Sequence, residues 1–191
     1  IELPEDGLQF NNFKMNAIKE DHEYDGIRIT FDGWLKKVRI PMQLDISTGD
    51  KITPDATELL FPGILGMNET YIKSYPKETV FSEKAEAMVQ LDTATSRMKD
   101  IYDLYIIIRM FTETLDKEIL KAAITTTFTH RQTKIPKAPA KVFSDHFYND
   151  FNKQKQWKAF IKKSTEPTLQ LEEAIKVIAD LINPLFDEIH S

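Results

Sequence analysis

The spacing of apolar residues changes once along this chain, and that change limits the folds that it can adopt. In the first 50 residues apolar and polar positions alternate, as at Ile27, Ile29 and Phe31, which is typical of a half-buried strand. Residues 38–46 repeat the alternation, and Tyr24-Asp25-Gly26 predicts a turn. We therefore expect an antiparallel meander of three strands in this part of the chain.

After residue 76 the apolar positions recur at helical spacing instead, while residues 49–76 are rich in proline and glycine and predict loops. Three predicted helices cover residues 80–91, 98–108 and 116–125. On the first, the expected apolar face consists of Val80, Lys84, Ala87, Met88 and Leu91. Residues 130–141 contain two prolines and predict an extended connector.

Three more helices complete the prediction. Ser144 is the expected cap of a helix that carries both Phe147 and Phe151, and Trp157 lies on the next. The last helix begins near Leu171, with a kink or break expected near Pro184. Strands followed by helices indicate an α+β fold, a small antiparallel sheet before a helical lobe. We place a sheet domain with its loop in residues 1–75 and the helical lobe in residues 76–191.

Composition excludes several kinds of site. The 191 residues include no cysteine, so thiol nucleophiles, disulfides and cysteine-ligated zinc are excluded, and a cytoplasmic location is expected. The four histidines are scattered, which disfavours a histidine-ligated metal. No apolar run approaches the ~18 residues that span a bilayer, so we expect no membrane association. The chain begins at Ile1 without a methionine, and we expect a fragment or a processed product.

Charge is distributed unevenly. The net charge is −5, yet residues 121–163 carry 10 basic and two acidic side chains, interleaved with aromatic residues. Such a segment suits a nucleic acid, because phosphates attract the cations and exposed bases stack on the rings. The candidates for binding an acceptor RNA are Arg131, Lys134, Lys153, Lys155 and Lys158. The alternative is that the aromatic residues are core and the lysines form a solvated face.

A lysine and two carboxylates form the second candidate group. Lys84 lies among small and apolar neighbours, and an ammonium in such a place is costly to bury unless it is paired. Asp100 and Asp103 are three residues apart, so they share one face of a helix. This combination favours phosphate and metal chemistry. The alternatives are a lysine that extends to solvent or pairs with Glu83 or Asp103, and an ordinary helical pair between Lys99 and Asp103.

Two patterns in this region carry a resemblance to a known family. Residues 78–89 read E-T-x-x-x-E-K-x-E-A-M-V and residues 96–104 read S-R-x-K-D-x-x-D-L. The chain resembles the AbiEii/AbiGii toxin family, nucleotidyltransferases of bacterial toxin–antitoxin and phage-defence systems. Thr127-Phe128-x-x-Arg131 and Gln156-Trp157-x-Ala159-Phe160 extend the resemblance over nearly the whole chain.

The resemblance implies an activity and roles for particular residues. It implies transfer of a nucleotide from a nucleoside triphosphate, with Mg²⁺, to an acceptor such as tRNA, in a protein with a cognate antitoxin. Asp45 matches the third metal-binding carboxylate, although Ser47 and Thr48 stand where the family favours Gly and Phe. Nucleotide phosphates are expected at Lys84, Arg97 and Lys99. The expected catalytic set is Asp45, Lys84, Asp100 and Asp103.

The family's opening motif, Gly-Ser followed by Asp-x-Asp, is absent from this sequence. We interpret the absence as truncation, and expect that the fragment cannot transfer nucleotides because Asp45 alone cannot hold two metal ions. A rarer alternative is a family member that lost the motif and became a non-catalytic binder.

Two further hypotheses belong to other functional classes. A nucleic-acid-binding or regulatory domain would use residues 121–163 without Asp45. A structural interaction module would leave Asp45, Lys84 and Asp100 exposed and far apart. The sequence disfavours a kinase, because it has neither the H-R-D-x-x-x-x-N pattern nor a glycine-rich loop.

Overall fold

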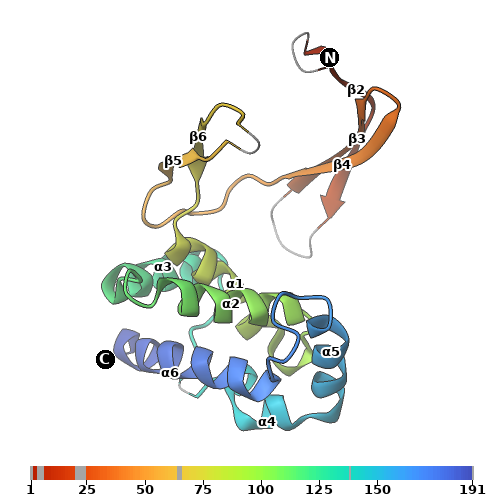
Figure 1. Ribbon diagram of the computed structural model, residues 1–191. Helices are drawn as coiled ribbons and strands as arrows, with labels where there is room; N and C mark the ends of the chain where they lie inside the picture. Colours follow the sequence, from red (N-terminus) through yellow and green to blue (C-terminus); the bar gives the residue numbers. More distant parts are fainter. Residues whose placement is uncertain (1, 4–6, 20–24, 64–65, 138, 191) are drawn as a thin grey trace. The chain divides into compact units, whose positions relative to one another are not determined.

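The computed structural model describes residues 2–3, 7–19, 25–63, 66–137 and 139–190. The chain divides into two compact units, Ile1–Asp50 and Lys51–Ser191. Figure 1 shows strands in the first unit and a hairpin with helices in the second. The fold is therefore mixed α+β, with small antiparallel sheets and a helical C-terminal region, as the sequence predicts.

The first unit is an antiparallel sheet in the order β1-β2-β3-β4. Its strands are β1 (Glu2–Leu3), β2 (Leu8–Lys19), β3 (Asp25–Leu35) and β4 (Val38–Ile46). The predicted meander of three strands corresponds to β2, β3 and β4 and is confirmed; β1 is a short addition at the edge. The turn predicted at Tyr24-Asp25-Gly26 begins outside the described residues, and Asp25 and Gly26 belong to β3.

Strand register separates the two faces of this sheet. Ile29 pairs with Leu44 and Phe31 pairs with Met42, so apolar side chains share one face. Arg28 pairs with Asp45 on the opposite, polar face. The alternation in the sequence thus becomes a division between faces, with Asp45 among polar residues.

The second unit opens with a hairpin that the sequence analysis missed. Strands β5 (Thr57–Phe61) and β6 (Thr70–Ser74) pair antiparallel, with Leu59 opposite Ile72. The prediction that residues 49–76 are rich in loops did not include this pair of strands. Pro54 and Pro62 flank β5, and the proline and glycine signals around so short a strand masked its apolar run.

Helices make up the rest of the second unit. They are α1 (Lys77–Leu91), α2 (Met98–Phe111), α3 (Lys117–His130), α4 (Asp145–Asn149), α5 (Phe151–Ile161) and α6 (Leu171–Ile189). Short 3₁₀ turns lie at Asp92–Ala94 and Lys141–Phe143. None of the helices in the described part of the chain has the length and apolarity needed to cross a membrane.

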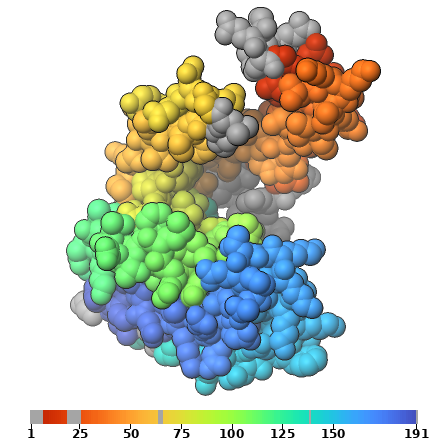
Figure 2. All heavy atoms as spheres, in the orientation of Figure 1, coloured from red at the N-terminus to blue at the C-terminus, as the bar shows by residue number. Residues whose placement is uncertain are grey.

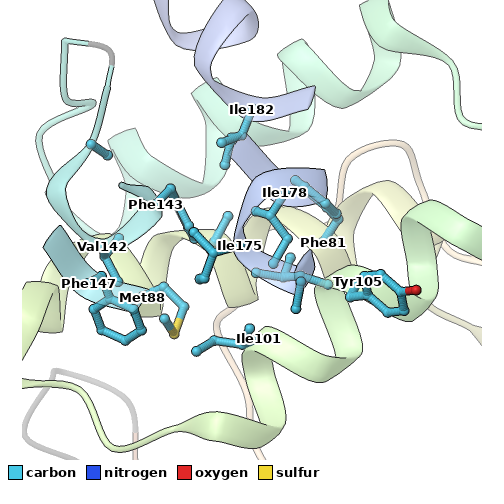
Figure 3. Close-up of a cluster of buried hydrophobic side chains, with 14 of the residues drawn as sticks. Phe81, Met88, Ile101, Tyr105, Val142, Phe143, Phe147, Ile175, Ile178 and Ile182 are labelled. Atoms are coloured by element: carbon cyan, nitrogen blue, oxygen red, sulfur yellow. The ribbon is translucent and has the colours of Figure 1, made fainter. Parts of the chain in front are cut away.

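The hydrophobic core lies between these helices. Figure 3 shows Phe81 and Met88 from α1, Ile101 from α2 and Ile178 from α6 converging, and each is fully buried. Figure 2 shows α2 and α3, in green, lying against α6, in blue, although these helices are far apart in the sequence. Burial of such side chains stabilises the unit and fixes α1 against α2.

The structure corrects one helix prediction and excludes one alternative of another. Phe147 and Phe151 do not share a helix, because the chain turns at Asp150, whose side chain accepts a hydrogen bond from the Lys153 amide. Ser144 precedes α4 without capping it through its side chain. Of the kink or break expected near Pro184, the break does not occur, because α6 continues through the proline and its buried apolar stripe anchors it on both sides.

Candidate functional site

The candidate site lies between α1 and α2, where Lys84 meets two carboxylates. Its ammonium lies 3.0 Å from Asp100 Oδ1 and 2.7 Å from Asp103 Oδ2. The side chains of Lys84, Asp100 and Asp103 are 22%, 16% and 21% exposed, so the group is largely but not fully covered. The prediction that the two aspartates share a face is confirmed.

Packing of the two helices explains how these residues meet. The buried side of α1 includes Ala87 and Met88, as predicted, and also Phe81 and Ala85, which were not predicted. Leu91, predicted to be buried, is 39% exposed. Lys84 therefore lies at the border of the core, not inside it, where its stem is covered and its ammonium reaches α2.

Two further cations surround the carboxylates. Arg97 lies 3.5 Å from Asp100, and Lys99 lies 2.6 Å from Asp103 in the predicted i,i+4 pair. The side chains of Arg97 and Lys99 are 54% and 72% exposed. Three cations thus share two carboxylates, so the cluster keeps one excess positive charge at neutral pH. An excess of positive charge at a partly open site attracts anions.

The environment shifts two pKa values within the cluster. Burial alone would lower the pKa of Lys84, but hydrogen bonds to Asp103 and Asp100 outweigh it and the pKa is raised. Burial alone would raise the pKa of Asp103, but hydrogen bonds from Lys84 and Lys99 outweigh it and the pKa is lowered. Lys84 and Asp103 are therefore both ionised at neutral pH.

A buried lysine supports the start of α2. The Lys153 side chain donates to the Thr95 carbonyl oxygen at 2.6 Å, and its ammonium lies 5.5 Å from the centre of the Phe147 ring. The Thr95 hydroxyl in turn accepts a hydrogen bond from the Arg97 amide. Lys153, predicted to bind an acceptor, thus also fixes the segment from which Arg97 and Asp100 project.

Asp45 lies on the polar face of the first unit's sheet. Its two oxygens accept hydrogen bonds from Arg28 at 2.8 and 2.9 Å, and Gln43 donates to it at 3.0 Å. The Arg28 guanidinium lowers the pKa of Asp45. Across the described ranges, no three His, Asp or Glu side chains come together as a metal-binding group.

The other members of the predicted acceptor surface divide into two kinds. Arg131 lies 3.0 Å from the buried Glu86 and 3.9 Å from Glu83, in a seam between α1 and α3. The Thr133 hydroxyl also bonds Glu86. By contrast, Lys134, Lys155 and Lys158 have exposed side chains. Only these three therefore lie on the surface as predicted.

A polar seam around Glu86 was not predicted from the sequence. Ser82 on α1 and Thr127 on α3, both buried, share a hydrogen bond of 2.8 Å beside it. Glu86 stands between Ala85 and Ala87, and a lone acid in that setting was the available signal. The Thr127-Phe128-x-x-Arg131 pattern thus fixes α3 on α1, because Phe128 is fully buried and Arg131 pairs with Glu86.

The geometry contradicts one part of an earlier hypothesis. A purely structural module was expected to leave Asp45, Lys84 and Asp100 exposed and far apart, whereas Lys84 and Asp100 form a largely covered ion pair. Asp45 belongs to the other unit, and each unit is described by itself.

Comparison with known proteins agrees with the resemblance seen in the sequence. Lys84, Arg97 and Lys99 form a partly open cluster of cations that is paired with Asp100 and Asp103. The family described as "Nucleotidyl transferase AbiEii toxin, Type IV TA system" matches residues 4–189, and the chain belongs to this family. Comparison with curated proteins gave no match. Family membership places the chain among nucleotidyltransferase toxins of toxin–antitoxin systems.

Proposed function

We propose that Lys84, held by Asp100 and Asp103, binds the phosphates of a nucleoside triphosphate during nucleotide transfer. The observation that carries this proposal is the ammonium shared by two carboxylates at a site that keeps a net positive charge. The carboxylates fix the ammonium in place, so little reorganisation is needed when a phosphate arrives. Arg97 and Lys99, which are more exposed, supply the outer contacts.

Magnesium is the proposed cofactor, with Asp45 as one ligand. The described residues do not complete such a site, since Asp45 is a single carboxylate already held by Arg28 and Gln43. Two-metal catalysis of nucleotide transfer needs additional carboxylates. We therefore expect the 191-residue chain by itself not to transfer nucleotides, and assign it nucleotide and acceptor binding.

The proposed acceptor is an RNA such as tRNA, bound through the exposed lysines of the basic segment. A cytoplasmic location, a role in phage defence and an antitoxin that need not touch the toxin complete the proposal.

A second candidate is a non-catalytic nucleic-acid-binding or regulatory domain of the same fold. The engagement of both Asp45 oxygens by Arg28 favours that candidate.

Nucleotide titration of the whole chain tests the proposal. We expect Lys84→Met to weaken binding of each nucleoside triphosphate by about tenfold or more, as the loss of a charged hydrogen bond predicts. Lys117→Met, an exposed lysine at the start of α3, is the matched control and should bind as the parent does. Equal binding by the parent and Lys84→Met, with both folded by circular dichroism, would refute the phosphate role.

Transfer is tested separately, with Mg²⁺, α-labelled nucleotides and total tRNA. We expect no label transfer by this chain. We expect transfer when a segment with Gly-Ser and Asp-x-Asp is supplied, and its loss in Asp45→Asn. Transfer by the chain alone would contradict the first expectation. Absence of transfer from the supplemented, folded protein would favour the binding domain.

A further inference from the structure

The outer face of α5 combines an exposed aromatic ring with a row of lysines. One side of α5 presents four residues at helical spacing over three turns: Phe151, Lys155, Lys158 and Lys162. All four side chains are exposed, and Phe151 is 79% exposed. Figure 1 shows α5 beside α4, and the packed side of α5 is formed by Trp157 and Ile161.

The core does not account for this ring. Phe147 and Trp157, the neighbouring aromatic residues, are each 1% exposed and supply the packing here. Phe151 stands instead at the first position of α5, directly after the capping Asp150. An aromatic side chain left in water at a rigid helix end is available for stacking.

The charge on the same face is uncompensated. Residues 151–163 contain five lysines and no acid, and only Lys153 is turned inward. Among the residues that the structure describes, none forms an ion pair with Lys155, Lys158 or Lys162. Asp150, the nearest acid in the sequence, is engaged by the Lys153 amide. The face therefore presents a row of cations to solvent.

We propose that this face, Phe151 with Lys155, Lys158 and Lys162, binds single-stranded nucleic acid. The ring stacks on an unpaired base and the lysines contact successive phosphates. At 1.5 Å per residue, the row extends over about 16 Å, the length of a few nucleotides. A duplex offers no unpaired base on which the Phe151 ring could stack. An acidic protein surface would pair with the lysines but would leave the Phe151 ring without a role.

This inference deepens the proposed function, on which it rests, by naming the acceptor surface and its substrate class. It also changes the set of residues from the sequence analysis. Arg131 and Lys153 leave the set, because they bond to Glu86 and to the Thr95 carbonyl oxygen. Phe151 is added as a stacking residue and Lys162 as a phosphate contact.

The test is binding of a mixed-sequence 12-nucleotide RNA to the whole chain, measured by fluorescence anisotropy at several salt concentrations. We expect Phe151→Ala to weaken binding by about tenfold with an unchanged salt slope, and Phe151→Trp to retain it. We expect Lys155→Ala and Lys158→Ala each to reduce the slope by about 0.7. Phe61→Ala and Lys117→Ala, at exposed positions elsewhere, should bind as the parent does.

Four outcomes would overturn the inference, and a fifth would refute only the proposed phosphate site. Parent-like binding by Phe151→Ala removes the stacking role. An equal loss for a duplex probe removes the single-strand preference, and equally strong binding of polyglutamate points to an acidic protein partner. Absence of RNA binding alongside nucleotide binding that depends on Lys84 refutes this inference alone. RNA binding that depends on Phe151, with no nucleotide binding, supports the surface and refutes the proposed phosphate site.

Discussion

At the scale of single residues, Lys84 shows how a charged side chain is kept at the edge of a core. Partial burial disfavours its ammonium, and two carboxylates from the neighbouring helix offset that cost. These contacts stabilise the packing of α1 on α2, and in the proposed function they also hold the ammonium in place for a phosphate. Stability measured against pH reports the first, and nucleotide affinity reports the second.

We predict that Asp103→Asn lowers the free energy of unfolding by about 1–2 kcal/mol at pH 7. This cost lies between those of breaking an exposed ion pair and a buried one, because the Lys84–Asp103 pair is partly covered. The pKa of Asp103 is lowered in the folded chain, so its contribution is present above the ordinary carboxyl pKa of about 4. It disappears as the pH falls through the lowered folded value. Urea unfolding of the parent and the variant at pH 7, 5 and 3 measures the difference.

The partner residue provides the control for this prediction. The pKa of Lys84 is raised, so its contribution is present below its ordinary pKa of about 10.4 and disappears as the pH rises through the folded value. Lys84→Met combined with Asp103→Asn should cost less than the sum of the single changes. A difference between parent and Asp103→Asn that is as large at pH 3 as at pH 7 would contradict the assignment.

At the scale of elements, the junction of α4 and α5 shows how a cap sets the orientation of exposed side chains. Asp150 ends one helix and begins the next, which buries Phe147 and leaves Phe151 in water. A single continuous helix would have placed both rings on one face, because four residues make about one turn. The exposed face of α5 therefore depends on this one carboxylate.

We predict that Asp150→Ala destabilises the chain by about 1 kcal/mol, the usual cost of losing an N-cap. Ser144→Ala is the matched comparison, because the Ser144 hydroxyl does not cap α4 and instead bonds the Lys141 carbonyl on the surface. It should cost less than about 0.5 kcal/mol. Urea unfolding compares the two variants, and an equal loss in both would show that Asp150 does not anchor α5.

At the scale of the whole molecule, the two units differ in how they are stabilised. The cluster of fully buried apolar residues lies entirely in Lys51–Ser191, from Phe81 to Phe186. The sheet of the first unit leaves apolar side chains in water, as at Val38 and Leu44, which are 61% and 50% exposed. We therefore expect the second unit to fold stably without the first.

We predict that residues 51–191, produced alone, unfold in one cooperative transition. Their free energy of unfolding should lie within about 1 kcal/mol of that of the corresponding transition in the whole chain. Residues 1–50 alone should show no cooperative transition. Circular dichroism during urea unfolding tests both fragments. Failure of 51–191 to fold would mean that the sheet stabilises the helices.

Part of the candidate site was predictable from spacing alone. Asp100, Asp103 and Lys99 lie on one helix, so their shared face and the ion pair follow from 3.6 residues per turn. Lys84 was marked by its apolar neighbours, but the predicted apolar face contained Val80, whereas Phe81 enters the core. The hairpin of β5 and β6 was missed, because pairing between short strands depends on contacts that no local pattern shows.

The sequence by itself determined the change from strands to helices, the uneven charge and the family, because each follows from local spacing or residue identity. The tertiary structure decided which cations are free. Lys153 and Arg131 look like Lys155 and Lys158 in the sequence, yet the first two are held inside by Thr95 and Glu86. The physical reason is that burial and ion pairing arise between helices distant in the chain, and only their packing determines which charges remain in water.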